Sequence, residues 1–269
     1  MRATKTLRPR QSLGKYRIEA KIAEGGFAVV YRAMDTIEGI RVALKIPHDN
    51  YVSDAMMEDF RQEIRMIAKL DHPNVLPLKN ASMIDGRLVI AFLLGERTLE
   101  DRLARRMSLP TCLDYSHQML KAIAYAHSQR IVHCDIKPPN FIIFPGNVLR
   151  LADFGIAKVS RKTVIGSGTG TVGHMAPEQA MGRPSFRSDV FAVGLIMYRM
   201  LSGVWPQWPF DWPPAGFERL SRRKVHPDLV KVLRKSLQTD PKLRFVDGGQ
   251  MLKSFETVVP RSLRYYQSR

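Results

Sequence analysis

Over the first fifty residues, apolar and polar positions alternate in short runs, which is the period of strands that bury one face. The runs at 16–22, 29–33 and 42–46 are separated by glycine-containing turns. We therefore predict a meander of antiparallel strands. The residues in front of it, 1–13, are basic and have no period, so they are predicted to form a loose arm.

A helical period follows, and the stretch 53–70 is predicted to be one amphipathic helix. Its apolar positions are Met56, Phe60, Ile64 and Ile67. Glu63 belongs to the same inward face, and a carboxylate there requires a cation nearby. The next apolar run, 87–94, is predicted to be a strand that ends at Gly95, where a short connection could join two lobes.

From residue 110 onward the pattern becomes mostly helical. Helices are predicted from 110 to about 126 and at 189–201, 227–237 and 249–258. Two short apolar runs flank Pro145-Gly146-Asn147, at 141–144 and 148–151, which indicates a hairpin. The stretch 189–201 is apolar nearly all round and stops at Gly203, which favours a buried helix with a glycine C-cap. The pattern as a whole predicts an α+β fold with a strand-rich first part and a helical second part.

Composition adds a strong positive charge to this picture. The chain has 42 Lys and Arg against 25 Asp and Glu, a formal charge of +17, which attracts acidic partners. Seven of the cations lie in a basic patch at 219–235, against one acid, Asp228. A solvated basic face is the plainer interpretation. No specific nucleic-acid module and no interleaved aromatic residues accompany the patch.

The chain of 269 residues, 45% of them apolar, is long enough for one large domain or two lobes that share a cleft. Its longest apolar runs, 88–94 and 190–198, are too short for a transmembrane segment, and the basic start is not followed by a signal sequence. We therefore expect a cytoplasmic protein. The two cysteines, Cys112 and Cys134, predict neither a disulfide framework nor a zinc site.

Four short motifs that can carry chemistry follow one another along the chain. They are VALK at 42–45, HCDIKPPN at 133–140, DFG at 153–155 and APE at 176–178. In this order and on these elements the motifs resemble those of the eukaryotic-like (Hanks-type) protein kinase family, and the resemblance covers about 16–258. The residues within the motifs look more like those of bacterial members of the family. The resemblance implies a two-lobed protein-kinase fold. It has a small antiparallel β-sheet N-lobe with one long helix and a larger helical C-lobe.

The same resemblance implies domain boundaries. We expect a basic arm at 1–13, an N-lobe at 14–94, a C-lobe at 95–259 and a short C-terminal tail at 260–269.

The resemblance also implies ATP and Mg²⁺ as cofactors and protein substrates as partners. Asp135 would accept or orient the proton of the substrate hydroxyl, and Lys137 would neutralise charge on the γ-phosphate. Asn140 and Asp153 would hold Mg²⁺. The residues expected to contact the nucleotide are Ile22, Ala23, Gly25, Gly26, Val30, Ala43, Lys45, Glu63, Phe92 and Leu93. Among them, Glu63 is the helix carboxylate that would pair with Lys45. A lysine two residues after the aspartate is the Ser/Thr form of the loop.

Other matching residues are expected to be structural. Glu178 would form an ion pair with Arg244, and Asp189 would bind the backbone of the catalytic loop. His133 is interpreted as a buried, hydrogen-bonded residue that orients this loop. Ile90 would lie at the back of the nucleotide pocket, and Thr171 would face the catalytic loop and the substrate.

Two positions depart from the family pattern. In the phosphate-covering loop, Ala23 and Ala28 stand where the family has glycine, and alanine is costless there only if its φ is negative. Cys134 stands where regulated members carry the arginine that pairs with a phosphate on the activation segment. Our hypothesis is that activity does not depend on such phosphorylation. Candidate phosphosites remain at Ser160, Thr163, Ser167 and Thr169.

The sequence leaves other functions open. A kinase-like pseudoenzyme scaffold would bind partners without catalysis, and the alanines of the phosphate loop motivate this alternative. A small-molecule kinase would share the two-lobed architecture, although the APE segment, Thr171 and Arg244 argue for a protein substrate. A basic nucleic-acid-binding protein is a further alternative, and it would account only for the positive charge.

Overall fold

The computed structural model describes residues 6–26, 28–48, 54–154 and 175–268, and within 54–67 it describes the backbone alone at 54–57, 59 and 63. The chain divides into two compact units. The described residues up to Gly95, with Phe154, belong to the first unit. The second unit contains 96–153 and 175–268.

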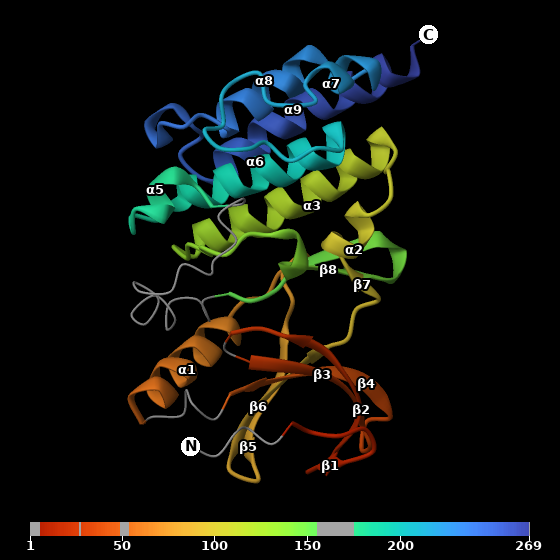
Figure 1. Ribbon diagram of the computed structural model, residues 1–269, viewed down its shortest axis with the longest axis vertical. Coiled ribbons are helices and arrows are strands. Elements are labelled where there is room, and N and C mark those ends of the chain that lie inside the picture. Colours follow the sequence, from red (N-terminus) through yellow and green to blue (C-terminus); the bar gives the residue numbers. More distant parts are fainter. Residues whose placement is uncertain (1–5, 27, 49–53, 155–174, 269) are drawn as a thin grey trace. The chain divides into compact units, whose positions relative to one another are not determined.

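The first unit is built on a six-stranded antiparallel sheet in the order β1-β2-β3-β4-β6-β5 (Figure 1). The strands are β1 (Ser12–Leu13), β2 (Tyr16–Glu24), β3 (Ala28–Asp35), β4 (Ile40–Pro47), β5 (Leu78–Ile84) and β6 (Arg87–Leu93). The helix α1 (Asp54–Ile67) follows β4 and contacts β5. The predicted meander, helix and strand at 87–94 are thus confirmed, whereas β5 has no counterpart among the sequence-based predictions.

The prediction of a loose arm is wrong for residues 6–13. Ser12 and Leu13 form β1 and pair with Arg17 and Tyr16. Leu7 is buried in the core of the sheet, and its N–H donates to the hydroxyl of Tyr31 at 3.2 Å. The apolar side chains of Leu7 and Leu13 explain the difference, since two buried leucines contribute several kcal/mol, about 1.5–3 each. The residues between them are mostly polar, so no run of alternating apolar positions indicates a strand here.

The second unit is mainly helical. Its helices are α2 (Leu99–Leu103), α3 (Leu109–Ser128), α5 (Pro177–Ala180), α6 (Phe186–Ser202), α7 (Glu218–Arg222), α8 (Pro227–Ser236) and α9 (Gly248–Gln267). A three-stranded antiparallel sheet joins β7 (Arg97–Thr98), β8 (Phe141–Phe144) and β9 (Val148–Leu151). The predicted hairpin is therefore confirmed as β8 and β9. Helix α3 packs against both α6 and α9 (Figure 1).

Helix α6 is the centre of the second unit. Fourteen of its 17 residues are buried, which confirms the predicted all-round apolar helix. At its N-terminus the N–H of Ser185 donates to the hydroxyl of Ser188 at 3.0 Å, and the N–H of Ser188 donates to the carbonyl of Ser185 at 2.9 Å. It ends at Gly203, whose φ of 78° is the left-handed C-cap conformation that glycine adopts without strain. These caps fix the ends of the helix that carries Asp189.

Helix α9 corrects the prediction at the C-terminus. The sequence predicted a helix at 249–258 followed by a tail at 260–269, but one helix continues through Pro260 to Gln267. Its buried positions, Met251, Phe255, Val258 and Ser262, keep one stripe at helical spacing past the proline. At its start, Gly248 approaches α3 so closely that a Cβ would lie 2.8 Å from the backbone nitrogen of Ala124. Only glycine fits there.

Among the described residues, none of the helices combines the length and the apolar composition that crossing a bilayer requires.

Candidate functional site

In the first unit, strand register brings several predicted nucleotide-contacting residues into one row. Ala23 pairs with Val30, Val30 with Lys45, and Lys45 with Ile90. Directly opposed residues of antiparallel strands project from the same face of a sheet, so this row shares one face. The opposite face, which includes Tyr31, is the buried core. Lys45 is thus on the less buried face of β4, where it is partly accessible.

Of the two β6 residues expected to contact the nucleotide, Phe92 lies in the neighbouring row of this face, whereas Leu93 pairs with Val42 on the opposite, core face. Ala43 pairs with Phe92, and Val42 with Leu93, at the end of β6. Because Ala43 and Lys45 are two residues apart on β4, Ala43 and Phe92 lie on the Lys45 face. Phe92 is 8% exposed, whereas Leu93 is half-buried. The side chain of Glu63, the expected partner of Lys45, lies outside the described residues.

The predicted phosphate-covering loop joins β2 to β3. Ile22 falls at a register shift between Lys21 and Ala23, and it is 48% exposed. The N–H of Gly25 donates to the carbonyl of Ala28 at 2.9 Å and closes the turn.

The backbone of this loop accepts its alanines. Neither Ala23 nor Ala28 has a positive φ, and Gly25 and Gly26 also lie outside the left-handed region. The condition under which alanine is costless at these positions is therefore met.

In the second unit, the predicted catalytic loop gathers three polar side chains. Oδ2 of Asp135 lies 3.0 Å from Nζ of Lys137. The Nδ2 amide of Asn140 donates to the same Oδ2 at 3.0 Å and to the backbone carbonyl of Asp135 at 2.8 Å. The side chain of Asp135 remains 36% exposed and that of Lys137 38%, while Asn140 is 5% exposed. An accessible carboxylate therefore lies beside a cation and is held by a buried amide.

Asp189 holds the backbone of this loop from α6. One carboxylate oxygen accepts from the N–H of His133 at 2.7 Å, and the other accepts from the N–H of Cys134 at 2.9 Å. Cys134 has a φ of 68°, a left-handed conformation that costs a non-glycine residue free energy, of order 1–3 kcal/mol. Hydrogen bonds to a buried carboxylate, about 1.5–3 kcal/mol each, offset that cost. The predicted backbone role of Asp189 is confirmed.

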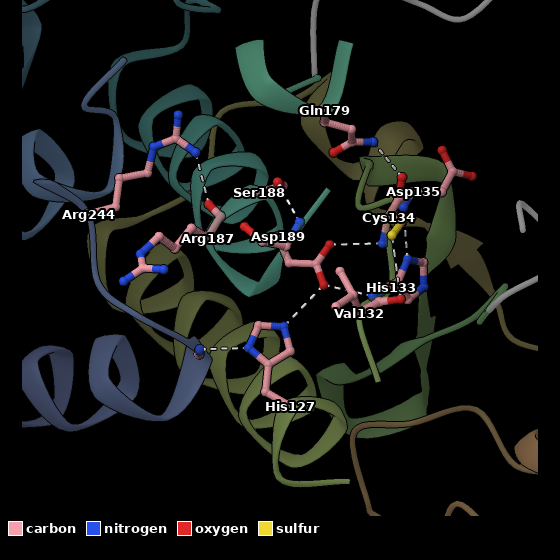
Figure 2. Close-up of polar contacts among 12 residues, drawn as sticks. His127, Val132, His133, Cys134, Asp135, Gln179, Arg187, Ser188, Asp189 and Arg244 are labelled. Carbon is pink, nitrogen blue, oxygen red and sulfur yellow. Dashed lines mark hydrogen bonds and ion pairs between the residues drawn. The ribbon is translucent and has the colours of Figure 1, made fainter. Parts of the chain in front are cut away.

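The two histidines beside the loop are orienting groups (Figure 2). Nδ1 of His133 accepts from the N–H of Asp135 at 3.2 Å, so Nε2 carries the proton that it donates to the carbonyl of Ala152 at 2.9 Å. His133 is 1% exposed, and both of its ring nitrogens are used inside the protein, which confirms the predicted orienting role. His127 accepts from the N–H of Gly248 at 2.8 Å and contacts Asp189 at 3.1 Å.

Helix α5 is anchored by a buried ion pair. The guanidinium of Arg244 donates to both carboxylate oxygens of Glu178, at 2.8 and 3.0 Å. The Arg244 side chain is fully buried, and burial lowers its pKa while the Glu178 carboxylate opposes that shift. The hydroxyl of Ser188 donates to Glu178 at 2.7 Å. The predicted pair of Glu178 and Arg244 is confirmed.

Gln179, the residue after Glu178 in the sequence, contacts the catalytic loop. The Nε2 amide of Gln179 donates to the backbone carbonyl of Cys134 at 2.6 Å (Figure 2). The backbone of Cys134 is therefore held at its N–H by Asp189 and at its carbonyl by Gln179. Sequence reasoning missed both Gln179 and His127, because their partners are distant in the sequence and no local pattern marks them.

The predicted magnesium ligands fit the ion by their donor chemistry. Because Asn140 uses Nδ2 for its two hydrogen bonds, its oxygen is the atom that can face a cation. Asp153 follows β9 with a φ of 64°, and the neighbouring N–H of Ala152 donates to the carbonyl of Asn140 at 2.7 Å. A carboxylate and an amide oxygen are hard ligands of the kind Mg²⁺ takes. In the part of the chain that the structure describes, no group of three or more metal-binding side chains forms a protein-only cage.

Several predicted residues lie outside the described part of the chain. They are Gly155 of the DFG motif, Thr171, and the candidate phosphosites Ser160, Thr163, Ser167 and Thr169.

Comparison with known proteins adds sequence and fold relatives. A family profile described as protein kinase domain matches residues 16–246. The serine/threonine-protein kinase PknA of Mycobacterium tuberculosis is 34% identical over 88% of this chain, and PrkC of Bacillus subtilis is 35% identical over 75%. This chain spans 59% of the length of PknA and 32% of that of PrkC.

The crystal structure of the Mycobacterium tuberculosis PknI kinase domain superposes with a TM-score of 0.72 at 22% identity. The superposition covers 94% of this chain and 99% of the PknI kinase domain. The protein-kinase fold expected from the motifs is confirmed.

Proposed function

Because the chain belongs to the protein kinase family, in its bacterial Hanks-type serine/threonine branch, we propose that it transfers the γ-phosphate of ATP to serine or threonine hydroxyls of proteins. The observation that carries this proposal is the cluster of Asp135, Lys137 and Asn140, an accessible carboxylate within 3.0 Å of a cation and of a buried amide. Because the proposed reaction consumes ATP, we propose that the chain acts where ATP is supplied, in the cytoplasm.

The proposed reaction uses each of these groups. The carboxylate of Asp135 accepts a hydrogen bond from the substrate hydroxyl and takes its proton as the new O–P bond forms. The bond between the γ-phosphorus and the bridging oxygen breaks, and ADP leaves with that electron pair. Lys137 supplies positive charge to the transferred phosphoryl group. Asn140 and Asp153 are the residues that would hold Mg²⁺, which would neutralise phosphate oxygens when bound.

We propose that the first unit binds the nucleotide, through the rows of paired residues on the Lys45 face of its sheet. Lys45 is proposed to bind the α and β phosphates, with Glu63 as its partner. Ala23, Val30 and Ala43 would contact the adenosine part, and Phe92 with Leu93 would contact the adenine. Ile22, Gly25 and Gly26 are the proposed phosphate-covering residues. The sheet face that Ala23, Val30, Ala43, Lys45 and Phe92 share and the neighbouring turn support this assignment.

Replacement of Lys45 by methionine is expected to abolish most transfer of labelled γ-phosphate from Mg²⁺–ATP, because the cation on the nucleotide is lost. The matched control is Lys69→Met, since Lys69 is an exposed lysine of the same unit. The readout is label incorporated into an acceptor protein per unit time. A pseudoenzyme scaffold, the alternative motivated by the alanines at 23 and 28, would give equal and negligible incorporation in all three proteins.

We further propose that activity does not require phosphorylation of the activation segment. Cys134 cannot bind a phosphate as an arginine does. In its place, the neutral amide of Gln179 contacts the Cys134 carbonyl, and the buried pair of Glu178 and Arg244 anchors the helix that carries it. These contacts contain no phosphate, so they support an active loop in the unmodified protein.

Phosphatase treatment is accordingly expected to leave turnover within about tenfold of its starting value. The measurement is kcat before and after treatment, with intact mass as the check on phosphate removal. In a separate assay without phosphatase, Gln179→Leu removes the amide and is expected to lower kcat by up to about tenfold, the effect of one hydrogen bond of 0.5–1.5 kcal/mol. A drop greater than about tenfold, 1.4 kcal/mol, on dephosphorylation alone would contradict the proposal.

A further inference from the structure

A pocket lined by arginine lies in the second unit, where the ends of three helices meet. Its volume is about 450 Å³, within the range of about 300–1,000 Å³ typical of ligand pockets. It is bounded by the segment after α2, the C-terminal end of α6 and helix α7. Its arginines are Arg105, Arg106, Arg199, Arg219, Arg222 and Arg223. We call it the arginine pocket.

Three of these arginines donate to backbone carbonyls, and Arg219 does so to that of Ser202 at 3.5 Å. Arg223 donates to the carbonyls of Met200 at 2.9 Å and Leu201 at 2.6 Å, and also to that of Met107. Arg199 donates to the carbonyl of Leu103 at 3.4 Å. Carbonyls at a helix C-terminus carry only partial negative charge, so these contacts orient the guanidinium groups without neutralising them.

The pocket keeps an excess of positive charge. Its lining contains no aspartate or glutamate. Within the described residues, only Arg219 among the six arginines has a carboxylate partner, Glu218, at 3.7 Å. Arg106 and Arg222 are exposed, and neither side chain makes a hydrogen bond or ion pair within the part of the chain that is described. The charge of these guanidinium groups is therefore available to an anion from outside.

The chemistry of the lining selects the ligand. Guanidinium groups present planar pairs of donors that match phosphate oxygens, and arginine remains charged at all physiological pH values. The side chains of Leu103, Met107 and Met200 add apolar contact for a neighbouring part of the ligand. The lining has no aromatic side chain on which a nucleic-acid base could stack. The pocket therefore fits a phosphate group attached to a partly apolar chain.

We propose that the arginine pocket binds a phosphorylated segment of a protein partner. This choice of occupant rests on the proposed function, because a kinase that acts on proteins meets phosphoserine and phosphothreonine on its own products. The pocket would hold a substrate that already carries phosphate. Its residues are separate from the residues assigned to phosphate transfer, so docking and chemistry can be changed independently.

The test measures binding with catalysis removed. The protein carries Asp135→Asn, and the probe is a short fluorescent peptide with two phosphoserines, at physiological salt. The pocket variant Arg106→Gln/Arg222→Gln is expected to bind this peptide at least about tenfold more weakly. The matched control Arg234→Gln/Arg264→Gln removes the same charge from exposed arginines of the same unit outside the pocket, and it is expected to bind within about twofold of the parent.

Three outcomes would overturn the pocket proposal. The two double variants would lose affinity equally, the unphosphorylated peptide would bind as tightly as the phosphorylated one, or an oligonucleotide or anionic vesicles would bind the pocket more tightly than the peptide. Failure of the proposed function is distinguishable, because it would abolish phosphate transfer while selective, pocket-dependent peptide binding persisted.

Discussion

Asp135→Asn is expected to lower kcat for phosphate transfer by about 10²–10⁴-fold, the usual contribution of a positioned acid or base. Asparagine has the same shape, so the loop held by Asp189 and His133 should persist. It lacks the negative charge that accepts the hydroxyl proton, and that charge is not replaced by Lys137 or Asn140. Nucleotide affinity should change little because Asp135 is not assigned to ATP binding.

Steady-state kinetics with Mg²⁺–ATP and a saturating acceptor protein give kcat for each variant. The matched control is Asp211→Asn, a change at an exposed aspartate of the same unit, and it should retain full activity. Equal thermal unfolding of the two variants would show that the loss is chemical. A fall of less than tenfold in Asp135→Asn would mean that another residue carries the proton transfer.

Arg244→Met is expected to reduce the free energy of unfolding by about 3–5 kcal/mol, because it leaves the carboxylate of Glu178 buried without its cation. Arg244 has no exposed side-chain surface, and Glu178 has 12%. The guanidinium also donates to the carbonyls of Gln238, Thr239 and Arg187, all of which would lose a partner. Methionine fills part of the volume but supplies no donor.

Urea unfolding followed by far-ultraviolet circular dichroism measures this loss. Lys242→Met, an exposed position two residues away, is the control and should change stability by less than about 0.5 kcal/mol. Addition of Glu178→Gln to Arg244→Met should recover part of the loss, since it removes the unpaired charge. Equal effects of Arg244→Met and Lys242→Met would show that the ion pair contributes little.

Local patterns predicted the elements that carry the proposed chemistry. Alternation located β2 to β4, and through them Lys45, because one face of that sheet is buried and the other is not. The all-round apolar run identified α6, which carries Asp189. The motifs then gave the order of the candidate site residues. Each of these signals lies within a few residues of the sequence.

The features that the sequence did not reveal depend on distant contacts. β5 carries polar residues such as Lys79 and Asn80 without clear alternation, and its pairing with β6 decides its structure. Gln179 meets Cys134 across 45 residues, and His127 meets Gly248 across 121. The arginine pocket combines side chains from three separate segments, of which only one belongs to the basic patch seen in the sequence. The spacing of apolar residues along a short stretch of sequence carries no information about such long-range contacts.

The chemical identity of the residue that receives the label tests most directly the proposal that this chain phosphorylates serine and threonine in proteins. Purified protein is incubated with γ-labelled ATP, Mg²⁺ and an acceptor protein, and the labelled acceptor is hydrolysed to its amino acids. Labelled phosphoserine or phosphothreonine that depends on Asp135 is the expected result. Absence of label, or equal labelling by the wild-type protein and Asp135→Asn, would contradict it.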